Sequence, residues 1–149
     1  MIYYIIFLFF LFNNDYMNKN LYKRYASILN FLPIVRLHDI IVVPVNNSIL
    51  TIDYTPINQS QPIVLLKLFM GKYLPAEVRI RRMRVWNLRE WYNSPCIIVD
   101  DITDNLMRNK IIKVIDNWNC IDNSNTKKIG MNLYKRNCKH FSNFFIKNF

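Results

Sequence analysis

The chain has 149 residues, of which 52% are hydrophobic, 15% are aromatic and 20% are charged, and this composition excludes an intrinsically disordered protein. Its two glycines are too few for the Gly-rich loops that bind phosphates and dinucleotides. The formal net charge of +10 favours anionic partners, and we expect an acidic membrane surface rather than nucleic acid.

Residues 1–12 form a continuous apolar run at the N-terminus. A helix of this length covers roughly 18 Å, which is well short of a hydrocarbon core of about 30 Å. Two interpretations stay open: an anchor that dips into a membrane, and an N-terminal element of the protein core. Lys19, Lys23 and Arg24 follow the run, as is typical of interfacial anchors. We therefore expect a protein that is membrane-associated through this segment or else cytoplasmic.

Residues 15–32 are predicted to form an amphipathic helix. Apolar side chains recur along one face of this segment, and Pro33 follows its end. On this basis residues 1–32 are an apolar N-terminal segment with an amphipathic helix, and residues 33–149 are the main domain.

The pattern then changes to that of strands. Residues 34–45 and 48–54 are β-branched runs, and the Asn-Asn dipeptide between them tolerates the positive φ of a tight turn. The two runs are therefore predicted to form a β-hairpin. With the two asparagines as turn residues, Ile40 lies opposite Asp53, unless Pro44 introduces a bulge that breaks this register.

Three more strands are predicted over residues 63–69, 77–86 and 96–100. A helix then begins after Thr103 or Asp104, and a last helix runs from Asn137 to the C-terminus. The order helix, antiparallel strands, helix, helix is typical of an α+β fold in which an antiparallel sheet packs against helices.

Asn137 is a good N-cap for the last helix, which places Cys138 in its first turn. The positive end of the helix dipole favours a thiolate there, so Cys138 is a candidate nucleophile, although a small buried core residue fits the same position. The other two cysteines, Cys96 and Cys120, form no CxxC pair. A disulfide framework and a Cys-based zinc site are therefore excluded, and we expect no metal, no cofactor and a reducing compartment.

A cysteine nucleophile needs a base, and the chain has two histidines. His140 lies two residues after Cys138, about 200° round the helix, and therefore points away from the thiol. His38 shares a strand face with Ile40, so it is a diagonal neighbour of Asp53 across the hairpin. An ionisable pair among Ile, Val and Leu side chains is costly unless its members are paired, and the alternative is a core histidine with satisfied hydrogen bonds.

Four stretches of the sequence carry a resemblance to a known family. They are Leu37-His38-Asp39-Ile40-Ile41-Val42, Ile49-Leu50-Thr51-Ile52-Asp53-Tyr54-Thr55-Pro56, Asn132-Leu133-Tyr134 and Asn137-Cys138-Lys139-His140-Phe141. They resemble the permuted NlpC-type papain-like fold and, more narrowly, its lecithin:retinol acyltransferase-like group, which has a histidine box and a late Asn-Cys box. The resemblance implies a circularly permuted papain-like fold in which Cys138 is the nucleophile, His38 the base and Asp53 the orienting third residue. In that group a strand usually precedes the histidine strand, at the place where this chain has the helix predicted over residues 15–32.

The residues and the resemblance together predict a cysteine-dependent hydrolase or acyltransferase that acts on an amide, ester or thioester through Cys138, His38 and Asp53. Its substrate would be a peptide or a lipid acyl group. In the acyltransferases of the group the orienting third residue is often His. This chain has Asp53 there, which suits a hydrolase equally well. The alternative is a catalytically silent, basic protein of the same fold that binds membranes or nucleic acid.

A basic and aromatic segment, residues 78–91, begins in the strand predicted over residues 77–86. It contains the candidate binding residues Arg79, Arg81, Arg84 and Trp86. Interleaved arginines and aromatic residues bind phosphate groups, which predicts contact with an anionic surface. The alternation of arginines with apolar residues also fits the solvated face of a strand, and both interpretations stay open.

Overall fold

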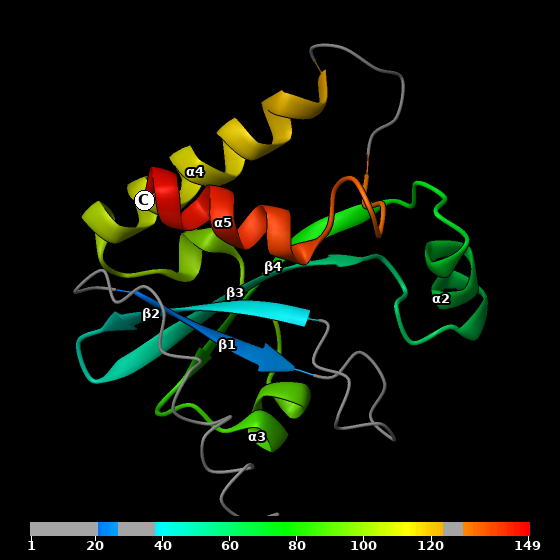
Figure 1. Cartoon of the computed structure of the whole chain (residues 1–149). Coiled ribbons are helices and arrows are strands. Elements are labelled where there is room, and N and C mark those ends of the chain that lie inside the picture. Colours follow the sequence, from blue (N-terminus) through cyan, green and yellow to red (C-terminus); the bar gives the residue numbers. More distant parts are fainter. Residues whose placement is uncertain (1–20, 27–37, 124–129) are drawn as a thin grey trace, which may run out of the picture.

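The computed structural model describes residues 21–26, 38–123 and 130–149, and the apolar run over residues 1–12 lies outside them. The elements are β1 (Tyr22–Ala26), β2 (His38–Val45), β3 (Ser48–Pro56), α2 (Pro62–Phe69), β4 (Ala76–Met83), α3 (Leu88–Asn93), a 3-10 helix (Val99–Asp101), α4 (Asn105–Asn123) and α5 (Cys138–Asn148). Over the described residues the strands form a four-stranded antiparallel sheet in the order β1-β2-β3-β4 (Figure 1). The predicted α+β class is confirmed.

Helices cover both faces of this sheet (Figure 1). α4 and α5 pack on one face, where Trp118 and Phe141 belong to the larger hydrophobic core. α3 packs on the other face, where Trp91 joins a smaller core around Ile40. Because β2 lies between these two cores, its first six residues are buried.

The hairpin of β2 and β3 has the predicted register, with Ile40 opposite Asp53. Asn46 has a φ of 50°, a left-handed conformation that asparagine tolerates in a tight turn. Pro44 takes part in the regular pairing, so the ladder contains no bulge at this residue. The first four residues of the predicted hairpin, 34–37, lie outside the described part of the chain.

The helix predicted over residues 15–32 is wrong where the structure describes it, because Tyr22–Ala26 forms strand β1. This strand pairs with β2, and Ala26 lies opposite His38. The backbone hydrogen bonds of that pairing satisfy an edge of β2 that would otherwise be buried and unpaired, and this tertiary gain outweighs the local helical periodicity. The remainder of the predicted helix lies outside the described residues.

The strand predicted over residues 63–69 is also wrong, since Pro62–Phe69 forms helix α2. A continuous apolar run does not by itself distinguish a strand from a helix. Pro62 stands in the first helical turn, where its fixed φ favours the helix and its missing N–H costs no hydrogen bond.

The last two predicted strands are shorter than expected. β4 confirms the strand predicted over residues 77–86 but ends at Met83. The strand predicted over residues 96–100 is reduced to a single bridge between Ile97 and Ile80, after which the chain turns into the 3-10 helix.

Helices α4 and α5 begin where the sequence predicts. The Asp104 carboxylate accepts a 3.0 Å hydrogen bond from the Met107 N–H, and the Asn137 side chain accepts one of 3.0 Å from the His140 N–H. Such caps satisfy N–H groups for which the first turn of a helix provides no acceptor. No helix in residues 21–26, 38–123 and 130–149 is long and apolar enough to cross a membrane.

The topology brings the start of β2 and the start of α5 to the same end of the sheet, opposite the hairpin turn (Figure 1). His38 is the first residue of β2, and Cys138 is the first residue of α5. Two residues that are far apart in the chain are therefore neighbours in space.

Candidate active site

His38 and Asp53 form a buried pair on the hairpin. The His38 Nε2 and Asp53 Oδ2 atoms are 3.0 Å apart, and Asp53 is fully buried. The hairpin register accounts for this contact, because it makes the two residues diagonal neighbours on one face of the sheet. The structure thus brings together two of the three catalytic residues that the sequence suggests.

Arg81 is the second partner of Asp53. Its Nη1 atom lies 2.9 Å from Asp53 Oδ1, and its Nε donates a 3.3 Å hydrogen bond to the carbonyl oxygen of Ser94. Its guanidinium group also lies 4.4 Å from the centre of the Trp91 ring. The sequence suggests an exposed contact residue at Arg81, and the structure corrects this, because the side chain is buried and its charge faces Asp53. The sequence does not reveal this pairing, since α2 separates β3 from β4 and no tight turn fixes their register.

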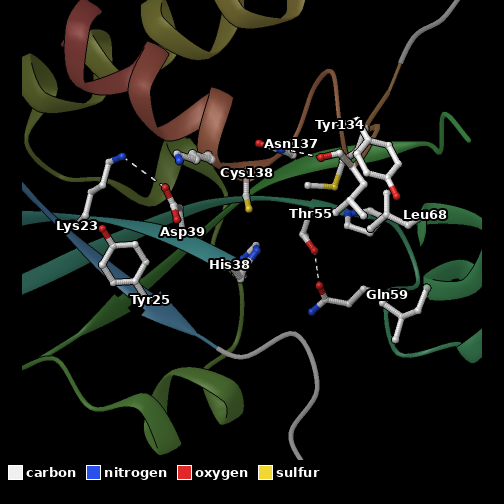
Figure 2. Close-up of a pocket in the computed structure, with 15 residues that line it drawn as sticks. Lys23, Tyr25, His38, Asp39, Thr55, Gln59, Leu68, Tyr134, Asn137 and Cys138 are labelled. Carbon is white, nitrogen blue, oxygen red and sulfur yellow. Dashed lines mark hydrogen bonds and ion pairs between the residues drawn. The ribbon is translucent and has the colours of Figure 1, made fainter. Parts of the chain in front are cut away.

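Cys138 lies beside the imidazole ring of His38. The interaction of its thiol with the ring is one of the causes that raise the pKa of His38. Figure 2 shows the sulfur directed at the ring from the start of α5. Cys138 is buried there, at the positive end of the helix dipole.

Opposing effects act on the pKa of His38. Burial of the ring lowers the pKa, but the hydrogen bonds and negative charges of Asp53 and Cys138 outweigh burial and raise the pKa from 6.5 to about 10. His38 is therefore an imidazolium at neutral pH. Charges then alternate along the buried chain, from the His38 imidazolium through the Asp53 carboxylate to the Arg81 guanidinium. Each buried charge has a partner of the opposite sign, which offsets its loss of hydration.

A second buried pair fixes α5 against β2. The Ser142 hydroxyl donates a 2.7 Å hydrogen bond to the Asp39 carboxylate, which also lies 3.4 Å from Lys23 Nζ. Asp39 follows His38 in β2, and Ser142 lies about one turn after Cys138 in α5. These contacts therefore set the distance between the imidazole and the thiol. Sequence reasoning missed them, although a carboxylate next to a candidate histidine is a signal for such a partner.

The thiol and the imidazole border a pocket of about 510 Å³ (Figure 2). This volume lies within the range of small-molecule sites in proteins. Leu65, Leu68 and Met131 supply apolar lining. Thr55 and Gln59 supply polar lining, and the Thr55 hydroxyl donates a hydrogen bond to the Gln59 side chain. An apolar wall and polar groups therefore lie together beside the thiol and the imidazole.

The other candidate residues do not line this pocket. His140 is exposed, and its Nδ1 accepts a 3.3 Å hydrogen bond from the Asn137 N–H, in keeping with a ring that faces away from the thiol. Arg79 forms an ion pair of 2.9 Å with a neighbouring glutamate. Arg84 is exposed and Trp86 is half-buried, so these two stay candidates for contact with an anionic surface.

Within the described residues, no group of three or more His, Cys, Asp or Glu side chains is placed to hold a metal ion. Cys96 and Cys120 are exposed, Cys138 is buried, and none of these three cysteines is in a disulfide.

Comparison of the chain with models of protein families, with curated proteins and with solved structures found no match. A thiol directed at an imidazolium that is itself paired with a carboxylate is the set of groups that nucleophilic catalysis at a carbonyl carbon uses.

Proposed function

We propose that the protein is a cysteine-dependent hydrolase or acyltransferase that acts on an amide, ester or thioester. Cys138 is the nucleophile, His38 the acid and base, and Asp53 the residue that orients the ring. The observation that carries this proposal is the His38 ring, whose Nε2 lies 3.0 Å from Asp53 Oδ2 and at which the Cys138 sulfur is directed from the start of α5. A histidine with a purely structural role requires neither a thiol partner nor a pocket beside it.

The arrangement accounts for both halves of an acyl transfer. The Cys138 thiolate attacks the carbonyl carbon, and the positive end of α5 stabilises the oxyanion that develops. The His38 imidazolium gives its proton to the leaving amine, alcohol or thiol, and a thioester on Cys138 remains. Neutral His38 then takes a proton from water or from an acceptor as that nucleophile attacks the thioester. Asp53 stabilises the imidazolium that forms again as the thiolate leaves.

Strand β1 supports the resemblance on which this proposal draws. The lecithin:retinol acyltransferase-like group usually has a strand before its histidine strand, and β1 pairs with β2 at this place in the chain. As part of the same proposal, the protein has a circularly permuted papain-like fold, and its substrate is a peptide or a lipid acyl group.

Trapping of an acyl-enzyme tests the proposal. The protein is incubated with an acyl thioester probe, quenched in acid and digested, and the modified peptide is identified by mass spectrometry. We expect one acyl group on Cys138, formed more slowly in His38→Ala than in His140→Ala. If the probe acylates Cys96 or Cys120 and leaves Cys138 unmodified, the proposal is wrong, and the catalytically silent membrane- or nucleic-acid-binding alternative takes its place.

A further inference from the structure

The outward side of α2 is apolar and exposed. Its side chains Ile63, Leu66, Phe69 and Met70 are between 46% and 64% exposed. They share one side of the helix, whereas Leu65 and Leu68 turn inward and line the pocket. An apolar group of this kind on the surface marks a site of interaction rather than a part of the core.

Tyr134 extends this apolar surface from the loop before α5. Its side chain is 66% exposed, and its hydroxyl donates a 3.1 Å hydrogen bond to the Phe69 carbonyl oxygen. Its ring also packs against Gly71. A Cβ atom added to this glycine would lie 3.3 Å from the Tyr134 ring. The loop and the end of α2 are thus held together. We name the combined surface the α2 face, and it consists of Ile63, Leu66, Phe69, Met70 and Tyr134.

The two described segments that carry the α2 face have charges of one sign. Residues 54–76 and 130–149 contain no Asp or Glu. Lys67, Lys72 and Lys135 lie in these segments, and all three are exposed. An apolar surface with a tyrosine beside it and lysines around it matches the interface of an anionic bilayer. A second copy of this chain fits less well, because it would bring the same positive charges together.

We propose that the α2 face docks on the surface of an anionic lipid membrane. Its apolar side chains would enter the headgroup region, and the surrounding lysines would contact the anionic headgroups. Since Leu65 and Leu68 line the pocket from the other side of the same helix, docking would place the pocket beside the membrane. Docking involves neither Cys138 nor His38. The docking proposal can therefore be wrong while the proposed catalysis is right, and the reverse is also possible.

Site-directed fluorescence measures the contact in the full chain. The three native cysteines are replaced by serine, and an environment-sensitive label is attached through Leu66→Cys. Leu106→Cys on α4 is the matched control, because Leu106 is also an exposed leucine, at 71% against 55% for Leu66. Vesicles that contain phosphatidylserine should shift the label at position 66 to the blue, and nitroxide lipids should quench it. The label at position 106 should show neither effect.

A second measurement keeps the native cysteines. Leu66→Asp should weaken cosedimentation with phosphatidylserine vesicles about tenfold and Lys67→Glu about fivefold, whereas Leu106→Asp and Lys113→Glu on α4 should leave it unchanged. A label at position 66 that is never quenched, or equal binding by Leu66→Asp and Leu106→Asp, would overturn the proposal. So would a change from dimer to monomer in Leu66→Asp with unchanged vesicle binding, because the face would then be a self-association surface.

Discussion

The carboxylate of Asp39 accepts a 2.7 Å hydrogen bond from the hydroxyl of Ser142, and both side chains are buried. Asp39 is the neighbour of His38 on β2, and Ser142 lies on α5 together with Cys138. This bond is therefore a direct link between the element that carries the proposed base and the element that carries the proposed nucleophile.

Ser142→Ala removes this link and leaves the Asp39 carboxylate with Lys23 at 3.4 Å. We expect the free energy of unfolding to fall by about 1–3 kcal/mol, because a buried carboxylate loses a hydrogen-bond donor. Turnover of an acyl probe should fall as well, since α5 is less well fixed against β2. Urea denaturation and probe kinetics measure the two effects. Ser48→Ala is the control, because the Ser48 hydroxyl donates a local hydrogen bond to Val45 in the hairpin turn, and a loss as large as that of Ser142→Ala would contradict the account.

Arg81 is expected to position Asp53 rather than to bind an external anion. Arg81→Met should destabilise the protein by about 3–5 kcal/mol, because it removes one of the two cationic partners of the buried Asp53 carboxylate and breaks a buried ion pair. Arg79→Met, which removes a more exposed ion pair on the same strand, should cost less than about 1 kcal/mol. Thermal or urea unfolding of the two variants makes this comparison.

Arg81→Lys keeps the charge and the fold but loses the planar guanidinium group that reaches Asp53 and covers Trp91. We expect turnover to fall between about tenfold and a hundredfold through misplacement of Asp53 and His38. Turnover equal to that of the wild type in Arg81→Lys would show that Arg81 has a structural role only.

The raised pKa of His38 predicts a dependence of stability on pH. Between pH 6.5 and about 10 the folded protein holds a proton on His38 that the unfolded chain has lost. The stabilisation that comes from protonated His38 is therefore complete below pH 6.5 and is lost as the pH rises through about 10. Above about pH 8.5, where cysteines of the unfolded chain have also lost their protons, the free energy of unfolding should fall by about 1 kcal/mol per pH unit more steeply in the wild type than in His38→Gln. Parallel curves for the two proteins from about pH 8.5 to 10 would disagree with a raised pKa.

The hairpin and its ion pair could be predicted from the sequence because their determinants are local. A two-residue Asn-Asn turn fixes which residues face each other, and the register then places His38 beside Asp53. Capping signals are equally local, so the starts of α4 and α5 could be located from Asp104 and Asn137.

Other features depend on partners that are distant in the chain. β1 is a strand because β2 offers it an edge, and no pattern within Tyr22–Ala26 reveals that edge. The role of Arg81 follows from the register of β3 with β4, which a connection through α2 does not fix. The bond between Asp39 and Ser142 depends in the same way on how α5 packs against β2.

The rate of alkylation at each cysteine tests the central claim most directly. Cys138 is buried, whereas Cys96 and Cys120 are exposed, so accessibility alone predicts that Cys138 reacts most slowly. If His38 and the dipole of α5 hold Cys138 as a thiolate, iodoacetamide at neutral pH should instead label Cys138 fastest. His38→Ala should then slow this labelling sharply, and His140→Ala should change it little. Labelling of Cys138 that is no faster than that of Cys96 and Cys120 in the folded protein, or that is unchanged in His38→Ala, would contradict the account.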